Sequence, residues 1–408
     1  MKLAPDGEPD SPALSAGFIS PAARARHPVL LALSVVLVAV NLRPAVAGVG
    51  PVLPELRAGL PLSGAGAAVL TTLPVLCFGL LATVAPRLAR RFGIEAVLVG
   101  VMAALAAGAF VRVLDGPALL FAGTVVVGGS IAIGNVLLPP LIKRDFPDRS
   151  GLMMGVYTMA VSGAAAVAAG LAVPLADAGL GWRGALGAWA VPAAVAALAW
   201  LPRMRGDTRP PATPRSGRSL LRDPLAWQIT VFFGLQSLSF YAVLAWLPSM
   251  YRDFGATPAV AGFLLSVSGL VQIPVSLVVP TLANRAAHQI GYAAFGTASI
   301  GAGLAGVLLA PMAAPYLWVG LIGAGQGACF ALGLNLFVLR TQRVADTARV
   351  SAMAQSIGYT LCAAGPLLVG LLHDATGSWT VPLVLLLALL VPQLACGALA
   401  GRARTIRA

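Results

Sequence analysis

Twelve long apolar runs follow one another along this sequence of 408 residues, and they limit the choice of fold more than any other feature. An α-helix needs about 20 apolar residues to cross the hydrocarbon core of a bilayer. All 14 acidic residues lie in tails, in loops or at the ends of the runs. The sequence therefore predicts an all-α membrane protein with twelve transmembrane helices. The runs fall near residues 28–52, 63–85, 95–114, 117–140, 150–176, 184–202, 225–249, 259–281, 290–310, 315–339, 349–372 and 379–400.

Basic residues are distributed unequally between the two sides of these predicted spans. With the N-terminus placed in the cytoplasm, the inner segments hold 22 lysines and arginines and the outer segments hold 4. Because cytoplasmic loops of membrane proteins are enriched in these residues, we expect a multi-pass protein of the cytoplasmic membrane with both termini cytoplasmic. This scatter over short loops explains the net charge of +13 without a nucleic-acid partner. Only Arg43 is left inside a span.

The longest polar interruption, "RMRGDTRPPATPRSGRSLLRD" at 203–223, divides the spans into two groups of six. A weak internal repeat supports this division, since "PRLARR" at 86–91 returns as "PTLANR" at 280–285. We therefore expect two six-helix bundles in one orientation, which is an arrangement of the major facilitator transporters. The expected parts are a disordered cytoplasmic tail (1–27), an N-terminal bundle (28–202), a cytoplasmic basic linker (203–223), a C-terminal bundle (224–401) and a short cytoplasmic tail (402–408).

The middles of the third, sixth, ninth and twelfth predicted spans carry few or no strongly polar side chains. Such side chains lie mainly on the other spans. In a bilayer such groups face the protein interior or a water-filled path, so the other spans are expected to line a central cavity. Each single Asn or Gln could instead bind a neighbouring helix, and that alternative stays open. The residues are Asn41, Arg43, Asn135, Tyr157, Gln236, Tyr241, Ser268, Gln272, Ser276, Gln326, Asn335, Gln355 and Tyr359.

Arg43 is the most unusual of these residues. Counted from Pro28, it lies roughly 22 Å along a span of about 36 Å, too deep for easy contact with bulk water. Its charge needs backbone carbonyls, water or a bound anion, and Pro44 leaves the carbonyl of Val40 without its usual helical donor. A substrate or gating role is favoured over a simple tie to a neighbouring helix. Asn41 lies about 200° from Arg43 on a regular helix, so it could belong to the scaffold.

Other kinds of function find little support in the sequence. The four cysteines lack metal-ligand spacing and are read as small packing residues. Three separate histidines and dispersed acids argue against a membrane enzyme. No metal or cofactor is therefore expected. The first run with "AVA" at 45–47 loosely imitates a secretory signal, but it is too long and carries Arg43 within its apolar region.

Several segments resemble the cyanate and 2-nitroimidazole permease family of the major facilitator superfamily. They are "NLRPAVAGVGPVLP" at 41–54, "FGLQSLSFYAVLAWLP" at 233–248, "QIP" at 272–274 and "AMAQSIGYTLCAAGPLLVGLLHDATGSWTVP" at 352–382. The resemblance covers all twelve spans and implies two bundles that rock around a central site for small, often anionic or nitrogenous solutes. Its signature points to Asn41, Arg43, Pro44, Gln236, Tyr241, Trp246, Gln272, Gln355 and Tyr359.

One departure from the superfamily pattern concerns the loop after the second span. In "APRLARRFG" at 85–93, Pro86 stands where the superfamily usually has an aspartate, so the gating contact of that acid must be made in another way. Proton-coupled members often use an acid within the membrane, and the predicted spans offer none. Coupling through Glu55, Asp177 or Asp374 at helix ends stays open.

We therefore predict a monomeric transporter, not an enzyme, that works by alternating access on a small anionic or polar nitrogenous solute. The substrate-binding candidates are Asn41, Arg43, Tyr157, Gln236, Tyr241, Gln272, Gln355 and Tyr359. The first alternative is efflux of apolar cationic drugs, which a buried arginine without a membrane carboxylate disfavours. The second is a receptor or scaffold that transports nothing, which would not need polar groups on cavity-type helices in both halves.

Overall fold

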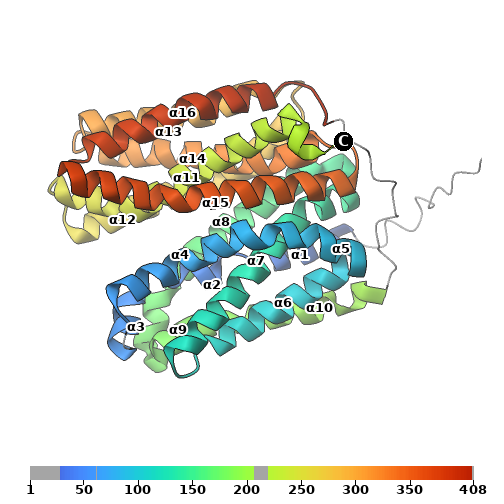
Figure 1. Ribbon diagram of the computed structural model, residues 1–408, viewed down its shortest axis with the longest axis horizontal. Helices are drawn as coiled ribbons and strands as arrows, with labels where there is room; N and C mark the ends of the chain where they lie inside the picture. The colour runs from blue at the N-terminus through green and yellow to red at the C-terminus, as the bar shows by residue number, and fades with distance from the viewer. Residues whose placement is uncertain (1–27, 61, 206–218, 407–408) are drawn as a thin grey trace, which may run out of the picture.

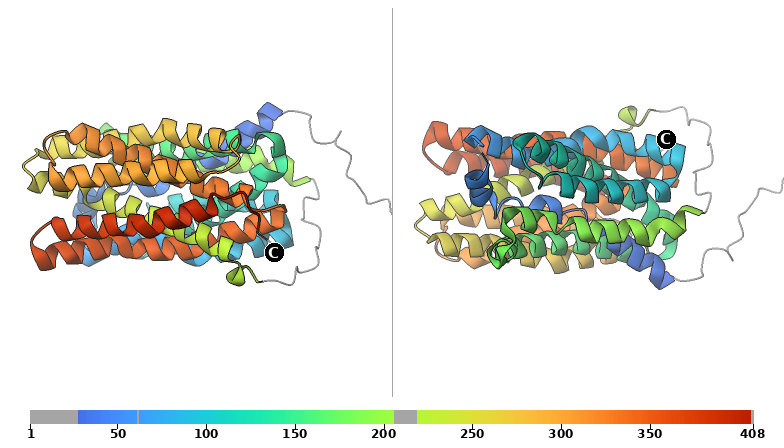
Figure 2. Two further views of the ribbon diagram at one scale, coloured as in Figure 1. Left: turned by 90° about the horizontal axis from the view of Figure 1, so that it is seen from above. Right: turned by 90° about the horizontal axis from the view of Figure 1, so that it is seen from below.

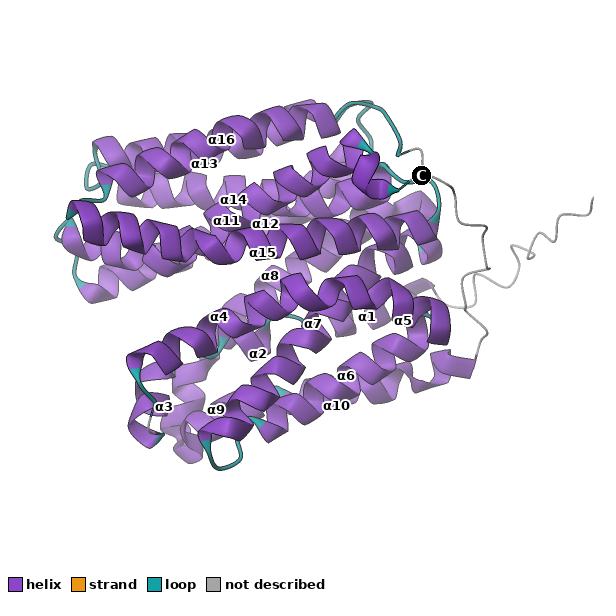
Figure 3. Cartoon of the chain, in the orientation of Figure 1, coloured by secondary structure: helices purple, strands orange, loops and turns teal. Residues whose placement is uncertain are grey.

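The computed structural model describes residues 28–60, 62–205 and 219–406, and these residues form helices joined by short loops, with no strand among them (Figure 3). The predicted tail 1–27 and residues 206–218 of the predicted linker lie outside the described residues. The helices of the first part are α1 (Pro28–Ala39), α2 (Pro44–Ala47), α3 (Leu53–Gly59), α4 (Gly64–Leu81), α5 (Ala85–Phe92), α6 (Ile94–Val111), α7 (Pro117–Asp145), α8 (Ser150–Leu175), α9 (Gly181–Gly187) and α10 (Ala190–Trp200). Those of the second are α11 (Pro224–Asp253), α12 (Pro258–Ala283), α13 (Ile290–Leu309), α14 (Pro315–Leu339), α15 (Val344–Thr376) and α16 (Thr380–Ala400).

The predicted twelve-span, all-helical fold is confirmed. Eleven helical segments of the described residues are long and apolar enough to cross a membrane. The run at 184–202 supplies the twelfth crossing through the shorter apolar helix Ala190–Met204, whereas α9 already belongs to the longer helical segment Pro147–Gly187. The first run differs from a simple span because its helix stops after Ala39 and starts again at Pro44.

The helices form two groups that run along the long axis of the molecule (Figures 1 and 2). We call residues 28–205 the N-half and residues 219–406 the C-half. The halves contact each other mainly through α4, α7 and α8 on one side and α12, α14 and α15 on the other. We call the end that carries the described C-terminus the linker end, and the opposite end, near α3, the far end. Figure 1 shows the halves close together at the linker end and diverging toward the far end.

The space around the glycines of α8 differs between the two ends of the molecule, as the separation of the halves does. A Cβ atom added at Gly155 would lie 2.4 Å from the carbonyl oxygen of Leu277 on α12, and one at Gly151 would lie 2.5 Å from Asn284 Cγ. At Gly163 and Gly170, farther from the linker end, an added Cβ would meet nothing within 4 Å. The α8–α12 contact is therefore close at the linker end, where only glycine fits.

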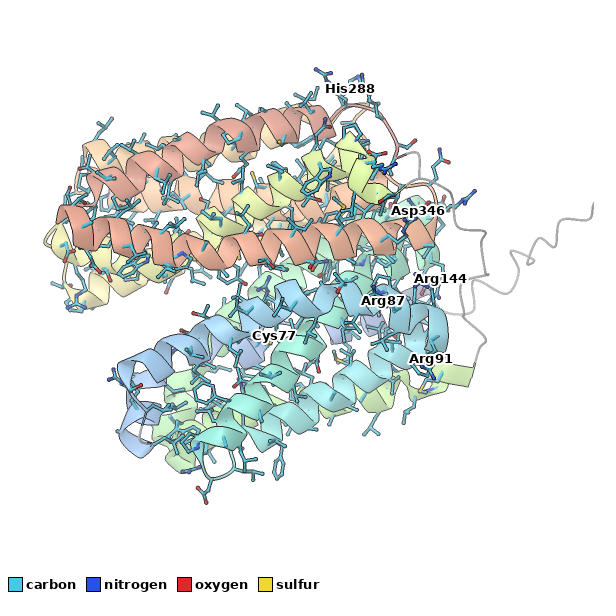
Figure 4. The ribbon with its side chains drawn as sticks, viewed as in Figure 1. Cys77, Arg87, Arg91, Arg144, His288 and Asp346 are labelled. Atoms are coloured by element: carbon cyan, nitrogen blue, oxygen red, sulfur yellow. The ribbon has the colours of Figure 1, made fainter. Side chains whose placement is uncertain are left out.

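An ionic network holds the N-half together at the linker end. Glu95, only 3 % exposed, accepts a hydrogen bond from Arg144 at 2.5 Å. Arg144 also binds Asp145 at 2.7 Å, and Asp145 binds Arg203 at 2.8 Å. Figure 4 labels Arg144 near the linker end of the molecule. Glu95, at the start of α6, is thus buried and paired with a charge on α7. From the sequence it was placed only at the end of an apolar run.

A contact between the halves at the linker end involves Lys143 of α7. Its Nζ donates to the carbonyl of Val338 at 2.8 Å and to the carbonyl of Thr341. The Val338 carbonyl lies in the last turn of α14, where carbonyls have no intrahelical donors and favour a cation, and the Thr341 carbonyl lies two residues beyond the helix end. This contact joins α7 of the N-half to the end of α14 of the C-half. Pro86, in the segment predicted as a loop, lies in the first turn of helix α5.

Candidate functional site

The first transmembrane segment is interrupted at residues 40–43, and the candidate site is built around this interruption. Pro44 begins α2 and has no N–H to give to the carbonyl of Val40. Arg43 caps α2 with φ −131° and ψ −34°, outside the regular helix. In a membrane, irregular backbone is tolerated where it is enclosed by protein or lines a water-filled cavity. The break therefore turns the Arg43 side chain away from the path that a continuous helix would impose.

The guanidinium of Arg43 reaches across the molecule to the C-half. Its Nη1 donates to the hydroxyl oxygen of Tyr241 on α11 at 2.7 Å. Its Nη2 donates to the hydroxyl oxygen of Tyr359 on α15 at 3.4 Å, close to the upper limit for a hydrogen bond. Three of the predicted residues, distant in sequence, are thus brought together where the halves meet.

Aromatic rings enclose the same guanidinium. The Cζ of Arg43 lies 5.7 Å from the centre of the Phe78 ring on α4 and 5.9 Å from that of Phe330 on α14. Phe78 also packs edge-on against Tyr359, with ring centres 5.4 Å apart. A cation within about 6 Å of an aromatic face is attracted by the negative charge density of that face. Phe78 and Phe330 therefore stabilise the charge from both halves.

The charge of Arg43 nevertheless has no anionic counterpart in the described part of the chain. The ion pairs found there involve other arginines and His373, and none includes Arg43. Its two hydrogen-bond acceptors are neutral hydroxyls, and a guanidinium carries five N–H donors. The Arg43 side chain is half-buried. An anion that reaches it would find a partly desolvated positive charge with free donors in one plane.

Tyr157 and Gln355 lie beside this cluster, and both bind Asn135 of α7. The Tyr157 hydroxyl donates to the side-chain oxygen of Asn135 at 3.1 Å. The Nε2 of Gln355 donates to the backbone carbonyl of Asn135 at 3.2 Å and to the hydroxyl of Ser351 at 2.8 Å. Tyr157 and Gln355 are only 1 % exposed. In this conformation both N–H groups of Gln355 are thus engaged by protein.

Gln236 and Gln272 occupy other parts of the interior. Gln236, 1 % exposed, accepts a hydrogen bond at 3.3 Å from the hydroxyl of its neighbour Ser237 on α11. Gln272 of α12 lies 3.5 Å from the Ser162 hydroxyl on α8, a long contact between the halves. Neither hydrogen-bonds to Arg43, so the structure does not join them to the arginine cluster.

Asn41 and Trp246 are fixed within their own halves. The Nδ2 of Asn41 donates to the carbonyl of Leu37 at 2.7 Å and to that of Pro192 on α10 at 3.3 Å. The indole N–H of Trp246 donates to the carbonyl of Pro366 at 2.8 Å, which joins α11 to α15. The described hydrogen bonds of Asn41 thus stay within the N-half, but the regular-helix direction used to predict a scaffold role does not apply, because residues 40–43 are not helical.

Arg112 is a second buried arginine, and it is one of the four basic residues assigned from the sequence to the outer segments, with Arg57, Arg183 and Arg252. Its side chain is 1 % exposed and donates to the carbonyl of Ala45 and, at 3.1 Å, to that of Leu186. Ala45 follows Arg43 by two residues within the single turn of α2. A backbone carbonyl left free by the end of so short a helix accepts this donor. Arg112 therefore anchors the segment that carries Arg43 to α6 and α9.

Comparisons with known proteins bear on the whole chain. Residues 31–361 match the model of the family described as the Major Facilitator Superfamily. The chain is 39 % identical to the 2-nitroimidazole transporter of Escherichia coli over 385 residues, 94 % of this chain and 98 % of that protein. It is 30 % identical to the cyanate transport protein CynX of the same organism over 351 residues, 85 % of this chain and 91 % of that protein.

The fold is shared with solved transporters of much lower sequence identity. A structure of the Escherichia coli fucose:proton symporter FucP superposes with a TM-score of 0.73 at 11 % identity, over 92 % of this chain and all of that one. At this identity the likeness concerns the fold alone. The helical architecture described above is thus one that occurs in transporters.

Proposed function

This chain belongs to the Major Facilitator Superfamily of membrane transporters, and we propose that it moves a small anionic or strongly polar nitrogenous solute by alternating access. The protein is a multi-pass membrane protein, and its substrate is a small molecule. The relatives named for 2-nitroimidazole and cyanate transport support solutes of that size and polarity as the substrate class. The charge bias of the loops supports the cytoplasmic membrane with both termini inside, so the linker end would face the cytoplasm.

One observation carries the substrate proposal: the charge of Arg43 lies at the junction of the halves among neutral hydroxyls and aromatic rings. In a medium of low dielectric constant, an unpaired charge is costly unless a counter-charge or strong dipole approaches it. A planar solute with two acceptor atoms, such as a carboxylate or nitro group, matches the forked geometry of the guanidinium. We propose that Arg43 binds the negative end of the solute, and that Tyr241 and Tyr359 orient the arginine.

Efflux of apolar cations is the weaker alternative for the same site. A cation would have to approach Arg43, and the repulsion between like charges is stronger at a partly desolvated site than in bulk water. The aromatic rings that could hold an organic cation are already occupied by the guanidinium. A receptor or scaffold that transports nothing is a third possibility, and it has no observation in its favour.

Uptake by purified protein in proteoliposomes tests the proposal. Radiolabelled cyanate and 2-nitroimidazole are offered with and without an imposed pH gradient, beside a lipophilic cation as the competing class. We expect the anionic or nitrogenous solute to enter and Arg43→Gln to lower kcat/KM by 100-fold or more, since two hydrogen bonds to a charged group are each worth about 1.5–3 kcal/mol.

The matched control is Arg57→Gln, because Arg57 is an exposed arginine on α3 and its replacement removes the same charge from the surface. We expect that variant to transport at the rate of the unchanged protein. Preserved binding and transport in a folded Arg43→Gln variant would show that Arg43 is not the anion site. Transport of the lipophilic cation alone would favour the efflux alternative.

A further inference from the structure

Prolines inside the helices of this chain leave particular carbonyl groups without a donor. The described helices contain nine such prolines: Pro74, Pro139, Pro140, Pro174, Pro248, Pro274, Pro280, Pro366 and Pro392. A proline within a helix lacks the N–H that would bind the carbonyl four residues earlier, and its cost in a helix is about 3 kcal/mol. Consecutive prolines at 139 and 140 therefore destabilise the α7 helix locally.

The two carbonyls released by the Pro139–Pro140 pair are those of Asn135 and Val136. Both accept hydrogen bonds from α15 of the other half: Gln355 Nε2 donates to Asn135 at 3.2 Å and Ser351 Oγ to Val136 at 3.2 Å. Gln355 also donates to Ser351 Oγ at 2.8 Å, which leaves the Ser351 proton for Val136. The donors and acceptors therefore match one to one.

The same relation occurs with the halves exchanged. Pro280 of α12 releases the carbonyl of Ser276, and the hydroxyl of Thr158 on α8 lies 2.8 Å from that oxygen. Thr158 has one proton and also lies 2.9 Å from the carbonyl of Met154 in its own helix, so this is the weaker of the three contacts. In all three cases a carbonyl four residues before a proline meets a side-chain donor from the opposite half.

We infer that Pro139, Pro140 and Pro280 act in the transport cycle by presenting backbone acceptors through which the two halves bind each other in the conformation that is open toward the far end. The inference rests on the alternating access of the proposed function. It also assigns Gln355 a role in closing the linker side, besides its candidacy as a substrate ligand. The prolines, Thr158, Ser351 and Gln355 are positioning residues in this scheme.

The energetics suit a contact that must break once in every cycle. When the halves separate, water can replace the partner of each released carbonyl and of each side-chain donor. The net free-energy cost of this replacement is small. A hydrogen bond between helices in a membrane changes an equilibrium by about threefold on average. Two such bonds bias the two conformations by about tenfold without locking either one.

The distance between two spin labels measures that bias directly. The labels are placed at Arg91→Cys and His288→Cys, two exposed positions in opposite halves at the linker end (Figure 4). The four native cysteines are replaced, and the protein is studied in lipid nanodiscs without substrate. Since no substrate is present, the outcome does not depend on which solute the protein carries, or on whether the anion-site proposal holds.

The acceptor variant Pro139→Ala with Pro140→Ala restores the helical donors, and the donor variant Ser351→Ala with Gln355→Met removes the side-chain groups. We expect each to lower the ratio of short to long label distances by about tenfold. Because both act on the same two bonds, their combination should shift the ratio no further than either variant alone. The matched control is Pro392→Ala in α16, which packs against α11, α13 and α15 of its own half, and its ratio should stay within about twofold of the unchanged protein.

Two results would overturn the inference. In the first, the acceptor variant shifts the distance ratio no more than Pro392→Ala does. In the second, the combined variant shifts the ratio by the product of the separate shifts of the acceptor and donor variants. If the α7 variant does not yield a monodisperse protein, the same cycle is run on Pro280→Ala and Thr158→Val, with an expected shift of about twofold to threefold for each. Independent effects of that pair would equally refute the role of the released carbonyls.

Discussion

The hydroxyl of Tyr241 offers a test of how Arg43 is held. Tyr241→Phe removes the acceptor at 2.7 Å from Nη1 and leaves the ring in place, whereas Tyr359→Phe removes an acceptor at 3.4 Å from Nη2. A hydrogen bond to a charged group is worth about 1.5–3 kcal/mol. Since Arg43 is half-buried and water can replace part of the lost interaction, we take about 1.5 kcal/mol for Tyr241, which corresponds to roughly tenfold in affinity.

The longer Tyr359 contact is taken as worth less than about 0.6 kcal/mol, because 3.4 Å lies beyond the usual N–H···O range of about 2.7–3.2 Å. We therefore expect the KM for uptake to rise about tenfold in Tyr241→Phe and less than about threefold in Tyr359→Phe. Initial rates over a range of substrate concentrations in proteoliposomes measure both. Tyr316→Phe, at an exposed tyrosine of α14, is the matched control. A larger effect of Tyr359→Phe than of Tyr241→Phe would refute this account of the arginine.

Two further predictions concern the scaffold. Gly155→Ala should force α8 and α12 apart, because the new Cβ would lie 2.4 Å from the Leu277 carbonyl oxygen. The distance between spin labels at positions 91 and 288 should therefore lengthen. Gly163→Ala, where an added Cβ meets nothing within 4 Å, should leave that distance unchanged. Arg112→Met should leave the carbonyls of Ala45 and Leu186 without their donor and lower the free energy of unfolding by about 2 kcal/mol, measured by thermal unfolding in detergent. Partial recovery of that stability by Arg112→Lys is expected, and equal stability of Arg112→Met and the unchanged protein would contradict the anchoring role.

The transmembrane architecture was predictable because the bilayer imposes one strong requirement on every span. Runs of about 20 apolar residues without acids have few other solutions. The same rule marked Arg43 as exceptional, and the structure places it at the junction of the halves. The break at 40–43 was predicted only in part from the sequence. Pro44 indicated a carbonyl without its helical donor, but the loss of regular helix before Arg43 depends on packing in three dimensions.

The partners of the buried polar groups could not be read from the sequence. Tyr241 and Tyr359 lie 198 and 316 residues from Arg43, and no local pattern pairs them. Phe78 and Phe330 look like ordinary core residues within apolar runs. Gln355 satisfied the pattern of a cavity residue, yet in this conformation it binds the carbonyl of Asn135. Whether a buried amide faces a substrate or another helix is decided by the neighbouring backbone, which composition and spacing do not describe.

The uncompensated charge of Arg43 has a consequence for the electrical behaviour of the transporter. A monovalent anion bound to Arg43 would make the loaded site electrically neutral, so its reorientation would move little net charge through the membrane field. The empty carrier retains the positive charge, and displacing one elementary charge across the full field changes its energy by about 2.3 kcal/mol per 100 mV. The membrane potential would then act chiefly on the return of the empty carrier, and voltage would govern the turnover of the protein more than its affinity for substrate.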